Sequence, residues 1–191
     1  MLSHPRHPPT QLPRRRALLL AAAAWGALTQ VTRAQPVAQE NQLKAACLAK
    51  FAQYVEWPDT AFATPAAPIV IGIVGEDLFG PDFANSLKGF KVGARPMTVR
   101  HCTGNVDCSG CHLLYLNLPD PARLKTELAH FKKRACFTAA DHPDFLKLGG
   151  MLRFWRDGEK IAFEINAAAL RTAGLSAHPR LLQLSRAPGD K

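Results

Sequence analysis

The sequence predicts a single α/β domain with a mainly parallel sheet, helices on its faces and an antiparallel hairpin near the C-terminus. Three observations lead to this fold class. Residues 68–74 form a continuous apolar run between a proline and a glycine, which is typical of a strand buried on both faces. Strand-like and helix-like segments then alternate along the chain. Residues 149–166 finally show the alternating pattern of two strands around an Asp-Gly turn.

The first helix is expected over residues 42–56. Apolar residues recur there at helical spacing and form one stripe: Leu43, Cys47, Phe51, Tyr54 and Val55. Trp57-Pro58 should end this helix, because the residue before a proline is disfavoured in the helical conformation. The apolar run 68–74 follows, and we expect it to lie centrally in the sheet.

The middle of the chain alternates between the two element types. We expect helices over 79–87 and 120–131, the second with Asp120 as its N-cap, and strands over 97–101, 112–117 and 134–139. This alternation favours parallel strands joined by helices that cover the sheet.

The hairpin of residues 149–166 is predicted to turn at Asp157-Gly158 in a type I′ turn, which needs positive φ at both central residues. That turn places Arg156 opposite Glu159, Phe154 opposite Ile161 and Leu152 opposite Phe163. Below the charged pair this face is apolar. The other face is mixed, with Met151, Arg153 and Trp155 opposite Glu164, Ala162 and Lys160.

Two short helices should follow the hairpin. Asn166 is a good N-cap for residues 167–172, and Gly174 stands where helices commonly end in the left-handed conformation. The last helix should begin near His178-Pro179, with the proline at the tolerated first position.

The N-terminus has the pattern of a secretory signal peptide. Residues 1–34 contain five arginines and no acidic residue, and Arg14-Arg15-Arg16 leads directly into the apolar residues 17–28. This run is too short to span a bilayer. Thr32-Arg33-Ala34 offers small residues for cleavage after Ala34. We therefore expect a signal peptide over 1–34, a domain over 35–191 and a periplasmic location, by either the general or the twin-arginine route.

Net charge gives little support for nucleic-acid binding. The whole chain carries 24 Lys and Arg against 15 Asp and Glu, but five of the arginines lie in the predicted leader. Because the remaining domain is only modestly basic, we expect no nucleic-acid partner.

Five cysteines in an exported chain point first to disulfides, with at least one thiol left over. Cys102, Cys108 and Cys111 form a C-x5-C-x2-C cluster flanked by His101 and His112, and a disulfide within this cluster is the main expectation. Zinc bound through thiolates and imidazoles is the alternative, but the spacing matches no strong zinc pattern, so we expect no metal and no cofactor. Cys47 is read as a small apolar residue of the first helix.

Nine short motifs occur in an order that resembles the YfiR-like periplasmic proteins, over about residues 40–186. They are Lys44-Ala45-Ala46, Phe51-Ala52, Val55-Glu56-Trp57-Pro58, Ile71-Gly72-Ile73-Val74-Gly75, Cys111-His112-Leu113-Leu114, Gly149-Gly150-Met151, Phe163-Glu164-Ile165-Asn166, Ala173-Gly174-Leu175 and Leu181-Leu182. The resemblance implies a small exported α/β domain that represses an inner-membrane diguanylate cyclase. It also implies release by an outer-membrane lipoprotein, and a homodimer is a further candidate assembly.

This chain departs from the resemblance in its cysteines. Relatives carry cysteines near the position of Gly72 and around the Gly-Gly-Met turn, where this chain has none, and only Cys111 matches. Cys102 and Cys108 are local additions, so the redox behaviour of relatives does not transfer.

Four residues are candidates for ligand binding. Glu164 lies on the mixed face of the hairpin, where a diagonal ion pair with Arg153 is the alternative. Arg171, His178 and Arg180 gather positive charge near the C-terminal helices and could bind an anion or a nucleotide, although solvated basic residues are the default.

Catalysis is not expected. The sequence lacks G-x-G-x-x-G, G-x-S-x-G and H-E-x-x-H motifs. Cys111 and His112 are neighbours on a strand and should point to opposite faces, which does not suit a catalytic pair. Two functions therefore stay open: a regulator that binds a membrane cyclase through an apolar surface patch, and a small-molecule binding protein with a polar cleft at the carboxyl ends of its parallel strands.

Overall fold

The computed structural model describes residues 34–103 and 107–189, without the side chains of residues 34–36. The chain divides into two units, residues 1–37 and 38–191, and the second holds the sheet. The predicted leader lies outside the described residues except for Ala34. Its cleavage and the division into leader and domain therefore stay predictions.

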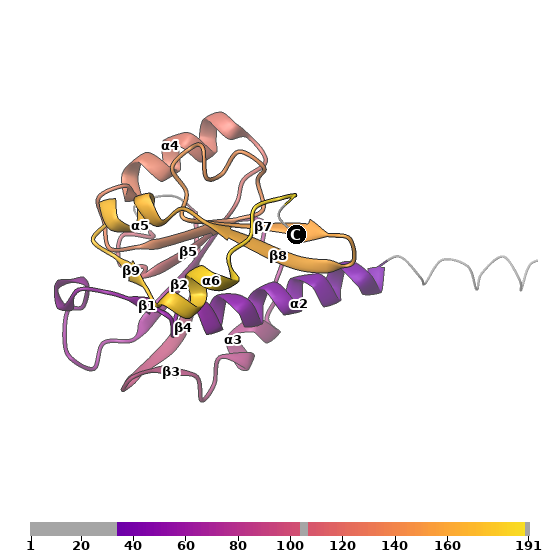
Figure 1. Cartoon of the computed structure of the whole chain (residues 1–191). Helices are drawn as coiled ribbons and strands as arrows, with labels where there is room; N and C mark the ends of the chain where they lie inside the picture. Colours follow the sequence, from indigo (N-terminus) through magenta and orange to yellow (C-terminus); the bar gives the residue numbers. More distant parts are fainter. Residues whose placement is uncertain (1–33, 104–106, 190–191) are drawn as a thin grey trace, which may run out of the picture. The chain divides into compact units, whose positions relative to one another are not determined.

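The sheet has seven strands in the order β3-β4-β2-β5-β6-β7-β8 (Figure 1). Their bounds are β2 Ile69–Gly75, β3 Lys91–Val92, β4 Arg95–Cys102, β5 Leu113–Asn117, β6 Phe137–Ala140, β7 Leu152–Asp157 and β8 Lys160–Ile165. The five inner strands are parallel, and β3 and β8 pair antiparallel at the two edges. The predicted fold class is confirmed, with β2 between β4 and β5 and the C-terminal hairpin formed by β7 and β8.

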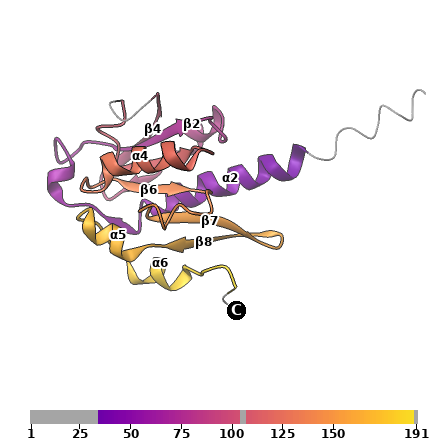
Figure 2. The ribbon, with the colours of Figure 1, turned by 90° about the horizontal axis from the view of Figure 1, so that it is seen from above.

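Helices cover both faces of this sheet. They are α2 Ala34–Phe51, α3 Asp82–Ser86, α4 Pro121–Phe131, α5 Ala167–Thr172 and α6 Pro179–Leu184, with a 3-10 turn at Asp59–Ala61. Buried residues of α2, α3, α5 and α6 join one apolar cluster, whereas those of α4 join a second cluster on the other face. Figure 1 shows α4 above the sheet and α2 below it, and in Figure 2 α4 lies in front of the strands and runs alongside β6.

The first helix differs from its predicted bounds of 42–56. It ends at Phe51, and the chain then forms strand β1 (Val55–Glu56), which pairs antiparallel with β9 (Ser176–Ala177). The predicted apolar stripe is also rotated, because Leu43 is 50 % exposed while Lys44 is 5 % exposed. Lys44 points inward because Asp141, the residue after β6, accepts its hydrogen bond. The helical spacing of apolar residues does not predict this contact.

The hairpin register is shifted by two residues from the predicted one. Arg156 pairs with Ile161, Phe154 with Phe163 and Leu152 with Ile165. The central turn residues are thus Gly158 and Glu159, and only Gly158 has positive φ, at 61°. Positive φ at the first central residue alone is the pattern of a type II′ turn, so the predicted type I′ turn is wrong. The shift of two keeps every side chain on its predicted face.

Three of the predicted helix ends, at Asp120, Asn166 and Gly174, are confirmed. Asn166 Oδ1 accepts a hydrogen bond from the backbone N–H of Ala169, at 3.0 Å, and Gly174 has φ of 72°. Asp120 caps α4 by accepting from the N–H of Ala122, at 3.0 Å. No described helix is both long and apolar enough to cross a bilayer.

Candidate functional site

A cluster of polar groups joins α2 to the middle of β5 and the carboxyl end of β6. Lys44 lies on the sheet side of α2, and its ammonium group donates a short hydrogen bond to Asp141, the residue that directly follows β6. The same ammonium is 2.6 Å from a carboxylate oxygen of Glu40, one helical turn earlier. Tyr115 of β5 donates its hydroxyl to the other oxygen of Asp141, at 2.9 Å. Four residues from three separate parts of the sequence thus form one network.

These contacts determine the protonation states of the network. Burial by itself lowers the pKa of Lys44, but the hydrogen bonds and charges of Asp141 and Glu40 outweigh it, so the pKa is raised and the lysine stays cationic. Burial and the neighbouring Asp141 charge raise the pKa of Tyr115 well above its ordinary value, so it stays a neutral donor.

Glu40, Lys44 and Asp141 of this network form one wall of a cleft of about 360 Å³. β7 forms the other wall, because β6 pairs with it only as far as Arg153 while β7 continues to Asp157. Arg153 and Arg156 bring two guanidinium groups, and Trp155 and Pro143 bring apolar surface. The cleft therefore combines charges of both signs with an aromatic ring, at the edge where α/β sheets usually bind ligands.

The two arginines of the cleft are held by carboxylates. Arg156 donates to Glu40 at 3.1 Å, and Arg153 donates to Glu164 at 2.9 Å and to the backbone oxygen of Pro143 at 2.8 Å. The Arg153 Nε is buried without a hydrogen-bond partner among the residues that the structure describes. A donor in that state offers a ligand one unused hydrogen bond.

The four predicted ligand-binding residues lie at different places. Glu164 is directly opposite Arg153 on the hairpin, not diagonal to it. Arg171 is exposed on α5, and Arg180 is exposed on the first turn of α6. His178 caps α6 by accepting from the N–H of Arg180, at 3.2 Å, and its ring lies 5.9 Å from that of Tyr54. Their role in ligand binding stays a prediction.

The sequence analysis missed Lys44, Tyr115 and Asp141 as site residues. Two weak signals were present: Tyr115 is the one hydroxyl in the apolar β5, and Asp141 directly follows the apolar β6. Polar residues at the carboxyl ends of parallel strands are expected to meet. The lysine gives no such signal, because it lies 97 residues from its partner.

His112 joins two strands to the 3-10 turn. Its Nδ1 accepts from the N–H of Val70 at 3.1 Å, and its Nε2 lies 3.1 Å from the backbone oxygen of Ala61, to which it donates. Burial lowers the pKa of His112, so the imidazole is neutral with its proton on Nε2. Both ring nitrogens are therefore used, and Cys111 faces the other apolar cluster.

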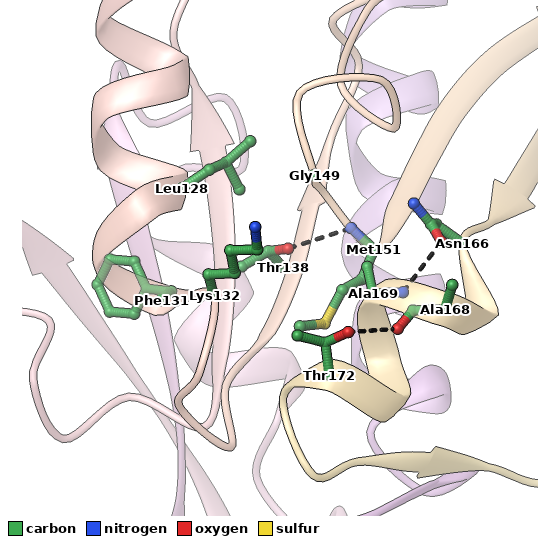
Figure 3. Close-up of a pocket in the computed structure, with 10 residues that line it drawn as sticks. All are labelled: Leu128, Phe131, Lys132, Thr138, Gly149, Met151, Asn166, Ala168, Ala169 and Thr172. Carbon is green, nitrogen blue, oxygen red and sulfur yellow. Dashed lines mark hydrogen bonds between the residues drawn. The ribbon is translucent and has the colours of Figure 1, made fainter.

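A second cavity, of about 200 Å³, lies between α4 and α5 (Figure 3). Its polar groups serve local structure: Thr138 accepts from the N–H of Met151 at 3.2 Å, and Thr172 donates to the backbone oxygen of Ala168 at 2.9 Å. Lys132 is its charged lining residue. This cavity offers a ligand fewer unused polar groups than the cleft at β7.

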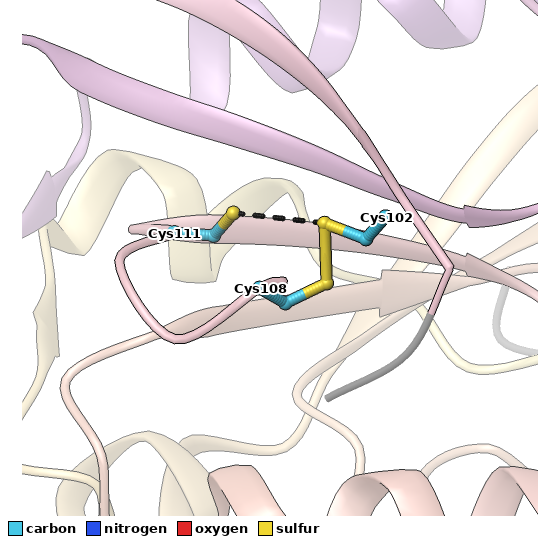
Figure 4. A group of neighbouring side chains, drawn as sticks. All are labelled: Cys102, Cys108 and Cys111. Atoms are coloured by element: carbon cyan, nitrogen blue, oxygen red, sulfur yellow. Dashed lines mark hydrogen bonds between the residues drawn. A yellow bond between two sulfur atoms is a disulfide. The ribbon is translucent and has the colours of Figure 1, made fainter. Parts of the chain in front are cut away.

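The cysteine cluster contains the predicted disulfide. Cys102, at the end of β4, is bonded to Cys108, and Cys111 is a buried free thiol (Figure 4). Cys136 is also a buried free thiol, while Cys47 is only half-buried on α2. Burial raises the pKa of the Cys111 thiol, and the Arg100 charge opposes that shift in part.

Comparison with protein families matches residues 41–186 to the YfiR/HmsC-like family. A search of curated proteins gives no match. The family consists of periplasmic proteins that repress diguanylate cyclases, and it is generally regulatory rather than catalytic. The matched residues include every strand of the seven-stranded sheet and both walls of the cleft except Glu40. The chain therefore belongs to the YfiR/HmsC-like family.

Proposed function

We propose that this protein represses an inner-membrane diguanylate cyclase from the periplasmic side and so lowers cyclic di-GMP signalling. The observation that carries the proposal is the family match over residues 41–186. A repressor of this kind acts by binding the inactive state of the cyclase more tightly than the active state. An outer-membrane lipoprotein is the proposed partner that releases it.

The proposed location follows from the N-terminal sequence. Three consecutive arginines precede the apolar residues 17–28, and a cleavage pattern ends at Ala34, which together indicate export. Export would bring the domain to the periplasmic segments of an inner-membrane cyclase.

We place the cyclase contact at α6. Two large apolar side chains are exposed there: Leu182 at 38 % and Leu184 at 66 %. Exposed apolar side chains on a small domain commonly mark a protein-binding surface. We call these two residues the leucine surface.

Cyclic di-GMP measured in cells tests the repressor function. Deleting the gene should raise the cellular concentration, and the full-length exported protein should restore it. A version without residues 1–34 should not restore it, because it would stay on the wrong side of the membrane. An unchanged concentration on deletion, under conditions in which the protein is produced, would contradict repression.

The cleft at β7 favours a second function, the binding of a small molecule. Its charged and aromatic lining lies at the carboxyl end of β6 and along β7, which fits the binding protein predicted as the alternative. Glu164 would act there through Arg153, whereas Arg171, His178 and Arg180 would form a separate anion site. Calorimetry with a candidate ligand tests which site binds it. If Arg153→Met abolishes binding and Arg180→Met does not, the ligand binds in the cleft. The reverse result would place the binding site at the C-terminal helices.

A further inference from the structure

Three sulfur atoms meet on the α4 side of the sheet. Cys102 ends β4, Cys108 lies on the following loop and Cys111 precedes β5. The three Sγ atoms lie within 4.8 Å of one another, and those of Cys102 and Cys111 are 4.0 Å apart. All three residues are at most 6 % exposed. Figure 4 shows the sulfur atoms at the corners of a triangle.

We propose that the reduced chain binds one thiophilic cation of the Zn(II) and Cd(II) class through the thiolates of Cys102, Cys108 and Cys111. Sulfur ligands at about 2.3 Å from such a cation are separated from each other by about 4 Å. The separation of Cys102 and Cys111 already has this value. Only Cys108 has to move away from Cys102 when their bond is reduced.

A glycine on the central strand makes the room for these sulfur atoms. A Cβ at Gly72 would lie 2.8 Å from the sulfur of Cys111 and 3.2 Å from that of Cys102. Because β2 separates β4 from β5, any side chain at this position would stand between the two cysteines. The absence of a side chain at Gly72 is therefore what lets sulfurs from either side of β2 approach each other.

Of the three cysteines, Cys111 lies beside a cavity and provides the proposed route for a cation from solvent. Cys111 lines a cavity of about 440 Å³ together with Ser109, Gly110 and Arg134. A water molecule from this cavity can supply the fourth ligand that Zn(II) usually takes. Arg100 of β4 brings a positive charge to the loop that carries Cys108, where its Nη1 donates to the backbone oxygen of Asp107 at 3.2 Å.

Imidazole ligands, which the sequence left open, do not fit. His112 uses both ring nitrogens in contacts with Val70 and Ala61. His101 is 65 % exposed and lies 3.8 Å from Asp77. The ligand set is therefore made of thiolates, which favours thiophilic cations over Mg²⁺ or Ca²⁺.

The disulfide and the cation exclude each other. A dithiol that reduces the Cys102–Cys108 bond transfers two electrons and two protons, yields two thiols and becomes a disulfide itself. The cation then displaces one proton from each of the three thiols. An oxidising compartment favours the disulfide, so the proposed site is available to the chain only before oxidation or in the presence of such a dithiol.

Titration with Cd(II) tests the proposal, because the ultraviolet absorbance of cadmium–thiolate bonds grows with the number of thiolates bound. The chain is reduced with a phosphine and titrated without oxygen. We expect saturation at one Cd(II) per chain, and a loss of about one third of the absorbance in Cys111→Ser with at least about tenfold weaker binding. Cys47→Ser, which removes a thiol from α2, should bind as the original chain does.

The oxidised chain provides a test that does not depend on any variant folding. With the Cys102–Cys108 disulfide intact it should bind Cd(II) at least about tenfold more weakly than the reduced chain. Equal binding by the oxidised and reduced chains would overturn the proposal. So would equal losses in Cys111→Ser and Cys47→Ser, with folding of both checked by circular dichroism.

Discussion

Gly72 lies on the central strand, where the start of a side chain would meet three neighbours. A Cβ there would be 2.5 Å from Leu114 Cδ2 and 2.8 Å from Cys111 Sγ, and both residues are buried. The crowding arises because β4 and β5 flank β2 on both sides. Glycine at this position therefore serves close packing, since its φ is not in the left-handed region.

Changing Gly72 to Ala should lower the free energy of unfolding by about 1–3 kcal/mol, because an extra methyl group overpacks the core. Urea unfolding measures this loss. Gly110→Ala is the matched control, because its Cβ would meet only Arg100 Nη1, at 3.9 Å. An equal loss in both variants would contradict the packing argument.

Lys44 is stable in its buried position because two carboxylates accept its charge. Changing it to Met should cost about 1–3 kcal/mol, since Glu40 and Asp141 lose a donor and Asp141 remains 37 % exposed to water. Lys125→Met, on the exposed face of α4, should change stability by less than about 0.5 kcal/mol.

A double-mutant cycle separates the ion pair from the change in volume. Lys44→Met and Asp141→Asn together should cost less than the sum of the single changes, by about 0.5–3 kcal/mol. Strict additivity in urea unfolding would mean that the two side chains do not stabilise each other.

At the scale of elements, the tip of the hairpin depends on Gly158. Its φ is 61°, and a Cβ there would touch nothing within 4 Å. Gly158→Ala should therefore destabilise the protein through backbone strain alone, by about 1–2 kcal/mol. Glu159→Ala, next to it in the turn and without positive φ, should change the melting temperature little; a larger loss there than at Gly158 would contradict this account of the turn.

His112 connects the 3-10 turn to β2 and β5 only while it is neutral, because its Nδ1 must accept from Val70. Its pKa in the folded state is lowered by burial from the ordinary 6.5. The unfolded chain therefore takes up the proton first as pH falls. The stabilisation is complete above about pH 6.5 and is lost progressively as the pH drops toward the lowered value.

Urea unfolding at several pH values between 7 and 5 should show this loss. His112→Leu should be less stable than the original chain at pH 7, since Val70 and Ala61 lose their partner, and its stability should fall less steeply toward pH 5. Parallel curves for the two proteins would assign the acid sensitivity to other groups.

At the scale of the whole molecule, the proposed repressor function depends on the leucine surface. Changing Leu182 and Leu184 to Glu should raise cellular cyclic di-GMP toward the level of the deletion strain, because charged groups would have to be desolvated at the contact. Phe90→Glu is the control: this side chain is 40 % exposed but precedes β3, outside the leucine surface. Full repression by the double variant, at equal protein levels, would mean that the cyclase contact lies elsewhere on the protein.

Local sequence patterns were sufficient for much of the fold. The run 68–74 predicted the central strand, and Asp120, Asn166 and Gly174 predicted helix ends that the structure confirms. These signals are local because caps and buried strands depend on a few neighbouring residues. The order of motifs likewise indicated the family that the comparison identifies.

The tertiary structure decided the features that depend on contacts between residues far apart in sequence. Lys44 faces the sheet instead of Leu43 because Asp141, 97 residues away, accepts its hydrogen bond. The hairpin pairs two residues further along than the turn sequence suggested, which places Arg153 directly opposite Glu164. The cleft at β7 and the approach of Cys111 to Cys102 across Gly72 likewise arise only when separate strands are packed together. The sequence by itself thus determined the fold class, the central strand and the helix ends at Asp120, Asn166 and Gly174. The end of the first helix, the hairpin register and the polar network required the packed chain, because their energies come from contacts between residues far apart in sequence.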